Sequence, residues 1–81
     1  MVAGGGEAEI VLRELVGVDS VDVQASGLSA GAKYNVFAVK ADGTRQIIGD
    51  FRADAMGKGM INPLLKFFDA GFVRVEVQKA A

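Results

Sequence analysis

The stretch "GLSAG", residues 27–31, has the spacing G-x-S-x-G that carries the nucleophilic serine of many hydrolases on a strand-to-helix turn. A serine nucleophile needs a base within hydrogen-bond reach, and histidine, the usual base, is absent from this sequence. A lysine base would have to be buried, whereas Lys33 opens a strand-like segment where we expect it to be exposed. The segment after the turn is also of β type and not helical. We therefore predict that Ser29 is a loop residue without a catalytic role.

Two other kinds of site can be tested on residue types and spacing. In "GDFRADAMGKG", residues 49–59, the glycines are too widely spaced for a phosphate-binding loop, and Lys58 is followed by glycine where Ser or Thr is needed. The lack of cysteine and histidine excludes a disulfide framework and the usual zinc sites. The aspartates do not follow the spacing of a calcium-binding loop. We expect no catalytic residue, no metal site and no cofactor, and predict that the protein is not an enzyme.

The composition fits one small folded domain. The chain has 81 residues, of which 51% are hydrophobic and 23% charged, and this excludes a disordered chain. Nine basic and ten acidic residues are interspersed, which argues against a nucleic-acid partner. The apolar runs are too short to insert into a membrane. A protein partner is the remaining expectation, and the composition leaves the oligomeric state open.

The N-terminal residues "MVAGGG" are rich in glycine and lack the basic and apolar regions of a signal peptide. We expect residues 1–6 to be a flexible leader and residues 7–80 to form a single domain. The next segment, residues 7–15, fits two structures. Alternation of Ile10 and Leu12 with polar neighbours fits a strand, and a stripe of apolar residues at helical spacing fits a helix. We favour the strand, because β-type segments follow directly.

Several later segments alternate as strands do. "SVDVQASGL" places Val21, Val23 and Ala25 on one face, and "KYNVFAVK", residues 33–40, is apolar on both faces, which is typical of a central strand. The dipeptide Asp42-Gly43 between two apolar runs predicts a hairpin turn.

The strand after this turn is "RQIIGDFRAD", residues 45–54. Its alternation predicts four residues that face inward, namely Ile47, Gly49, Phe51 and Ala53, and Gly49 could mark a bulge. "MGKGMI" predicts a turn and a short edge strand. "FVRVEVQK", residues 72–79, predicts a closing strand with Val73, Val75 and Val77 inward.

One segment carries helix signals. Asn62 is a good N-cap, Pro63 suits the first helical position and Gly71 suits the position after the last turn. We expect a short helix over residues 63–70. Its apolar residues cover more than one face, and a core-only role competes with a candidate protein-contact patch formed by Leu64, Leu65, Phe67 and Phe68. In sum, the sequence predicts an all-β fold, a small antiparallel, immunoglobulin-like β-sandwich of five to seven strands with this one helix.

Residues 21–59 carry a recognisable order of features: a strand running into Gly27-Leu28, a small-residue loop with Gly31, then Tyr34 in "YNVFAV", an Asp-Gly turn and "GDF". This order resembles the C-terminal extracytoplasmic β-domain of zinc-finger-type, anti-sigma-K-like anti-sigma factors. The piece "GLSAGAKYNV" also resembles the corner of fibronectin type III domains. That likeness implies a structural corner of Gly27, Leu28, Gly31 and Tyr34, in which the tyrosine hydroxyl bonds back to the chain.

These observations favour a non-catalytic protein-binding or structural module of a bacterial envelope or secreted protein. The resemblance implies an alternative, the extracytoplasmic sensor or regulatory domain of an anti-sigma factor, and it is also the basis for expecting an extracytoplasmic or secreted location. A carrier of a small apolar ligand and an engineered sequence are the further alternatives that the sequence leaves open.

Overall fold

The computed structural model describes residues 2–3 and 6–80, and the described residues are all β-strand, turn or loop. The strands are β1 (Val2–Ala3), β2 (Glu7–Glu14), β3 (Asp19–Ser26), β4 (Lys33–Lys40), β5 (Arg45–Arg52), β6 (Gly59–Ile61), β7 (Leu64–Leu65) and β8 (Phe72–Lys79). These are eight strands against the five to seven expected, and the excess comes from β1 and β7, which have two residues each. The all-β prediction is confirmed for this part of the chain.

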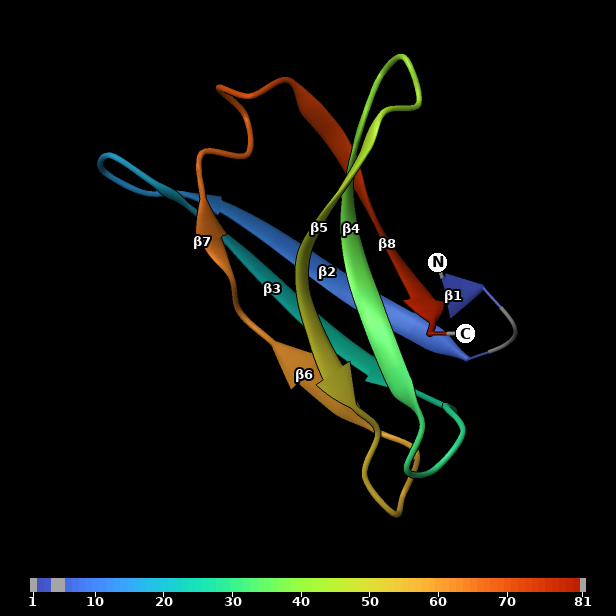
Figure 1. The fold of residues 1–81 in the computed structure, drawn as a ribbon. Coiled ribbons are helices and arrows are strands. Elements are labelled where there is room, and N and C mark those ends of the chain that lie inside the picture. The colour runs from blue at the N-terminus through green and yellow to red at the C-terminus, as the bar shows by residue number, and fades with distance from the viewer. Residues whose placement is uncertain (1, 4–5, 81) are drawn as a thin grey trace.

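The strands form two sheets that enclose one apolar core (Figure 1). The first sheet has the order β1-β8-β4-β5, and the second has the order β2-β3-β6, with β7 also paired to β3. Neighbouring strands are antiparallel except for β1, which runs parallel to β8. Both sheets contribute buried residues to the core, as in a small β-sandwich.

The alternation of residue types explains most of this arrangement. Val21, Val23 and Ala25 of β3 are buried, while Asp22, Gln24 and Ser26 between them are more exposed. Segment 7–14 is the strand β2, so the strand interpretation of this region is confirmed and the helix is excluded. The prediction that residues 33–40 form a central strand is also confirmed, because β4 has a neighbour on each side.

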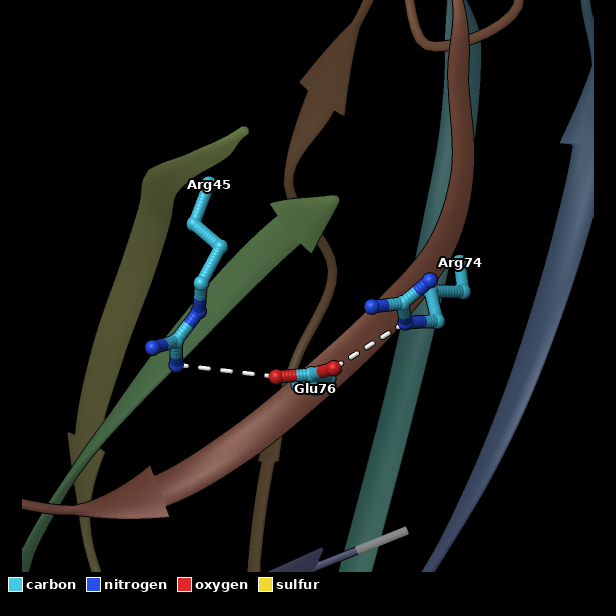
Figure 2. Close-up of polar contacts among 3 residues, drawn as sticks. All are labelled: Arg45, Arg74 and Glu76. Atoms are coloured by element: carbon cyan, nitrogen blue, oxygen red, sulfur yellow. Dashed lines mark hydrogen bonds and ion pairs between the residues drawn. The ribbon is translucent and has the colours of Figure 1, made fainter. Parts of the chain in front are cut away.

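Polar side chains cover the outer face of β4. Phe37 is half-buried and Val39 is fully buried on this face, away from the core between the sheets. The Arg45 guanidinium lies 4.2 Å from the centre of the Phe37 ring. Figure 2 shows Glu76 of β8 between two arginines, 3.5 Å from Arg45 Nη2 and 3.0 Å from Arg74 Nε. These long side chains shield the apolar residues of a central strand from water on its second face.

Asp42 and Gly43 form the predicted turn between β4 and β5. Gly43 has a φ of +91°, and its N–H donates to the Lys40 carbonyl at 2.9 Å. The Thr44 N–H donates to Asp42 Oδ1 at 2.8 Å, and this hydrogen bond holds the pKa of the Asp42 carboxyl below its usual value.

Two β-bulges change which residues face inward. In β5, Val36 is opposite Gly49 but Phe37 is opposite Ile47, so Ile48 is an extra residue in the strand. Ile48 therefore packs on the core and Ile47 is exposed, which corrects the inward assignment of Ile47.

The second bulge lies at the start of β8. Val39 is opposite Arg74 and Lys40 is opposite Phe72, which leaves Val73 as the extra residue. Phe72 is consequently buried and Val73 exposed, so the inward assignment of Val73 was wrong.

The predicted helix over residues 63–70 is absent. The Asn62 side chain donates to Ser20 Oγ at 2.9 Å instead of capping a helix, and the Pro63 carbonyl accepts from the Val21 N–H at 3.0 Å. Leu64 and Leu65 then pair with β3 as β7. Asn62 and Pro63 therefore hydrogen-bond to β3 instead of starting a helix. Pairing with β3 provides hydrogen-bond partners for the backbone groups of this segment and turns Leu65 towards the core.

Gly71, which was predicted to follow the last turn of the helix, ends a single turn before β8. The Gly71 N–H donates to the Phe68 carbonyl at 3.1 Å and the Phe72 N–H donates to the Phe67 carbonyl at 3.2 Å. Gly71 has a φ of +86°, and these two bonds are those of a Schellman motif at a helix end. The rings of Phe67 and Phe72 lie 5.6 Å apart, which supplies the hydrophobic contact that accompanies the motif.

Val2 and Ala3 belong to the segment for which a flexible leader was expected. Both are part of β1 beside β8, so this portion joins the first sheet. Residues 1, 4 and 5 lie outside the described residues.

Candidate functional site

The structure brings the residues of the predicted corner together between β3 and β4. The Tyr34 hydroxyl accepts a hydrogen bond from the Ser29 N–H at 2.9 Å. The Leu28 N–H donates to the Gly57 carbonyl at 2.9 Å, and the Gly31 N–H donates to the Ala53 carbonyl at 3.0 Å. Leu28 and Tyr34 are buried, so this corner belongs to the frame of the domain. Ser29 is exposed and contributes its backbone N–H.

Replacing Tyr34 by Phe should lower the free energy of unfolding by about 1 kcal/mol, because the Ser29 N–H loses its partner. The ring itself is retained, and its stacking on Phe51 at 5.7 Å between centroids is preserved. Chemical denaturation of the two proteins measures the difference. Ser29→Ala is the matched control and should change stability by less than about 0.5 kcal/mol, since it keeps the backbone donor. Equal stability of Tyr34→Phe and the wild type would contradict a stabilising hydrogen bond.

Exposed apolar side chains gather at a different place, which we call the hairpin end and define by Leu15, Val16, Leu64 and Phe68. Leu15 and Val16 form the tip of the β2–β3 hairpin, Leu64 lies on β7 and Phe68 lies in the turn before β8. Figure 1 shows this tip projecting from the body of the molecule, on the side where β7 lies. A shallow depression is lined by the tip and the turn together, with Leu15, Val18 and Phe68 as apolar members.

Asp19 fixes the geometry of this end. Its side chain is buried at the start of β3, and Oδ2 accepts a hydrogen bond from the Phe68 N–H at 3.0 Å. The bond joins residues that are 49 positions apart in the sequence, so it ties the turn before β8 to the base of the hairpin. Charged side chains of Glu14, Lys66 and Asp69 surround the depression. Apolar and charged side chains therefore share the lining of this depression, which is mainly polar, and Val16 and Leu64 lie outside it.

The four residues of the predicted contact patch are split by the fold. Leu64 and Phe68 are exposed, with 46% of Phe68 accessible, whereas Phe67 is fully buried and Leu65 packs against the core. Phe67 and Leu65 are therefore core residues, and their assignment to a surface patch is corrected. Strand β7 separates Leu64 from Leu65, because neighbouring residues of a strand point to opposite faces. Phe67 and Phe68 lie in the turn before β8, where Phe67 packs on Phe72.

Sequence reasoning missed Leu15 and Val16 as surface residues. The signal was present, because apolar residues directly before Gly17 stand where a hairpin turn normally carries polar ones. Asp19 was also missed, since only the fold brings it to Phe68.

Other features of the described residues offer little chemistry. No group of three or more metal-ligating side chains occurs in the part of the chain that the structure describes. Within the same residues, no helix is long and apolar enough to span a membrane. A second depression, lined in part by Glu7, Ser26 and Lys58, lies at the opposite end of β2 and β3 and is likewise mainly polar.

Comparison with models of protein families, with curated proteins and with solved structures gave no match to this chain. Its fold and surface describe a small β-domain of two sheets that exposes apolar side chains at the hairpin end.

Proposed function

We propose that this domain is a non-catalytic protein-binding or structural module, and that it contacts its partner through the hairpin end. The observation that carries the proposal is the exposure of four apolar side chains, Leu15, Val16, Leu64 and Phe68, on two neighbouring segments. Two of them, Leu15 and Phe68, line one depression together with charged residues, and exposed apolar side chains beside charged ones are typical of interaction sites.

The frame beneath these residues supports the proposal. The Asp19 carboxylate holds the backbone of Phe68, and the Phe68 ring rests edge-on against the buried Phe67 ring at 5.4 Å. An anchored aromatic side chain loses little further entropy when a partner binds. The contact surface is therefore partly preorganised.

The finer assignments rest on the corner and on the resemblance. The hydrogen bond between Ser29 N–H and Tyr34 hydroxyl is of the kind made by the corner of immunoglobulin-like sandwiches, and it supports an immunoglobulin-like arrangement. The same corner supports the second candidate, a sensor or regulatory domain of an anti-sigma factor. Extracytoplasmic placement in a bacterial envelope or secreted protein follows from that resemblance.

Site-specific photocrosslinking tests the binding surface. A benzophenone amino acid at position 16, which is fully exposed, should give a discrete protein adduct in cells that express the full chain. Introducing Phe68→Ser into the same protein should weaken that adduct severalfold, because the apolar surface loses its aromatic anchor.

The same crosslinker at position 58 provides the control. Lys58 is exposed and lies beside Glu7 and Ser26, at the opposite end of the β2–β3 pair. We expect no adduct there. Equal labelling from both positions, or no adduct from position 16, would contradict binding through the hairpin end.

A further inference from the structure

Strand β2 is a long and regular sheet edge. In the described residues its ladder partner is β3 alone, with an unbroken register over eight residues. The other free edges are irregular or short. Strand β5 carries a bulge, and β8 carries one at the start of the portion that β1 leaves uncovered. Strand β6 has three residues followed closely by Pro63, and β1 and β7 have two residues each. Strand β2 has neither bulge, proline nor lysine, and the edge-blocking device that it does carry is charge, at Glu7, Glu9, Arg13 and Glu14. Charges block pairing with strands in general but favour a partner that sets an opposite charge against each of them.

Hydrogen bonds at the ends of the ladder show which backbone groups of β2 point outward. The Leu15 N–H donates to the Val18 carbonyl at 2.9 Å, so odd-numbered residues of β2 face β3. The Val21 N–H donates to the Pro63 carbonyl, away from β2, and Val21 is opposite Leu12. Both observations place the N–H and C=O groups of even-numbered residues, from Ala8 to Glu14, on the free edge.

The sequence of this edge is complementary to itself. When two copies of β2 run antiparallel with Val11 opposite Val11, Ile10 faces Leu12 of the second copy on the inner side of the sheet. On the outer side, Glu9 faces Arg13 of the second copy, and Arg13 faces its Glu9. The even-numbered backbone groups then meet each other, as the hydrogen-bond pattern of an antiparallel pair requires.

We propose that β2 pairs with β2 of a second copy of this chain about a two-fold axis at Val11, which joins the second sheets of the two molecules. Cross-strand pairs of opposite charge and of apolar residues stabilise antiparallel strands. Ile10 and Leu12 are half-buried at the margin of the core, and pairing covers their accessible side. The interface is isologous, because each copy offers the same surface.

The neighbouring registers fit less well. A register centred on Leu12 would place Ile10 opposite Glu14 and Val11 opposite Arg13. A register centred on Ile10 would pair Glu7 with Arg13 but leave Glu9 opposite Val11. The register centred on Val11 sets Ala8 opposite Glu14, but this mismatch lies at the ends of the strands. Next to the axis it combines two Ile10–Leu12 pairs with two Glu9–Arg13 pairs.

Charge exchange at positions 9 and 13 tests the pairing through the molar mass in solution. The wild type should approach twice 8.4 kDa as its concentration rises to about 1 mM, a range suited to a weak interface. Arg13→Glu should raise the dimer dissociation constant roughly tenfold or more, since two ion pairs become like-charge pairs. Glu9→Arg should do the same for the same reason.

Combining the changes should restore the dimer in two ways. The double variant Glu9→Arg/Arg13→Glu regains opposite charges in every pair, and an equimolar mixture of the two single variants should form a heterodimer. Glu7→Arg is the register control, because it weakens the dimer only if the strands pair about Ile10. Unchanged circular dichroism shows that each variant is folded.

A wild type that stays monomeric up to about 1 mM would overturn the proposal, as would a dimer that is insensitive to Arg13→Glu or is not restored by charge exchange. Loss of the dimer in Glu7→Arg alone would also overturn the register centred on Val11. The two proposals are told apart by the mass of the adduct from position 16, because the register centred on Val11 sets Glu7 of the second copy opposite Leu15. An adduct of twice 8.4 kDa reports β2 pairing, whereas an adduct of any other mass reports a different partner at the hairpin end.

Discussion

Replacing Phe67 by Ala should lower the free energy of unfolding by about 3–5 kcal/mol, which is the cost of emptying a buried aromatic site. Phe67 is fully buried and touches both neighbouring aromatic side chains, with ring centroids 5.4 Å from Phe68 and 5.6 Å from Phe72. A domain of 81 residues has a total stability of about 4–12 kcal/mol. The loss is therefore a large share of the total, and denaturant unfolding should show a clearly lowered midpoint.

The adjacent residue supplies the matched control. Phe68 has the same side chain in the same turn but is 46% exposed, so Phe68→Ala should cost about 1 kcal/mol or less. A similar loss for both substitutions would mean that Phe67 is not the residue that closes this end of the core. The pair of variants thus separates the core residue from the contact residue, which the sequence alone did not do.

The sequence predicts the strands well, because alternation is a local property that each strand displays by itself. Segments such as residues 33–40 and 72–79 form strands with the bounds expected from their patterns. The predicted inward orientation of side chains was wrong where one extra residue enters a ladder, as at Ile48 and Val73. A bulge depends on how two strands twist against each other, and the sequence of one strand does not contain that information.

The prediction of a helix over residues 63–70 was wrong for a different reason. Asn62, Pro63 and Gly71 are sound local signals, but they compete with a partner strand whose backbone groups need hydrogen bonds. The Val21 N–H donates to the Pro63 carbonyl, and Leu64 and Leu65 then pair with β3. Of these three residues, only Gly71 has the role expected at a helix end, because it terminates a single turn. Tertiary pairing overrides helix propensity in so short a segment.

The candidate site could be predicted only in part for the same reasons. Leu64 and Phe68 were recognisable as apolar residues in excess of what a short element can bury. Their neighbours on the surface, Leu15 and Val16, come from a hairpin about 50 residues earlier in the chain. The sequence separates these segments, and the Asp19–Phe68 hydrogen bond that joins them is a product of the fold.

The second large effect is expected at Gly57, where alanine should lower the free energy of unfolding by about 3 kcal/mol or more. Gly57 has a φ of +73°, a conformation that costs an L-residue about 1–2 kcal/mol. A Cβ atom at this position would also lie 2.5 Å from the Leu28 carbonyl oxygen and 3.2 Å from its nitrogen. These are backbone atoms of the corner, so the neighbour cannot give way by a side-chain rotation.

Gly57 cannot move away without further loss. Its carbonyl accepts from the Leu28 N–H at 2.9 Å, and the Asp54 carboxylate binds the N–H groups on either side of it, at Met56 and Lys58. Gly31→Ala is the matched control, because its φ of +76° is similar and no atom lies within 4 Å of the added Cβ. We expect it to cost only the backbone strain of about 1–2 kcal/mol. Equal losses in the two variants, measured by chemical denaturation, would show that the close approach to Leu28 adds nothing to the requirement for glycine.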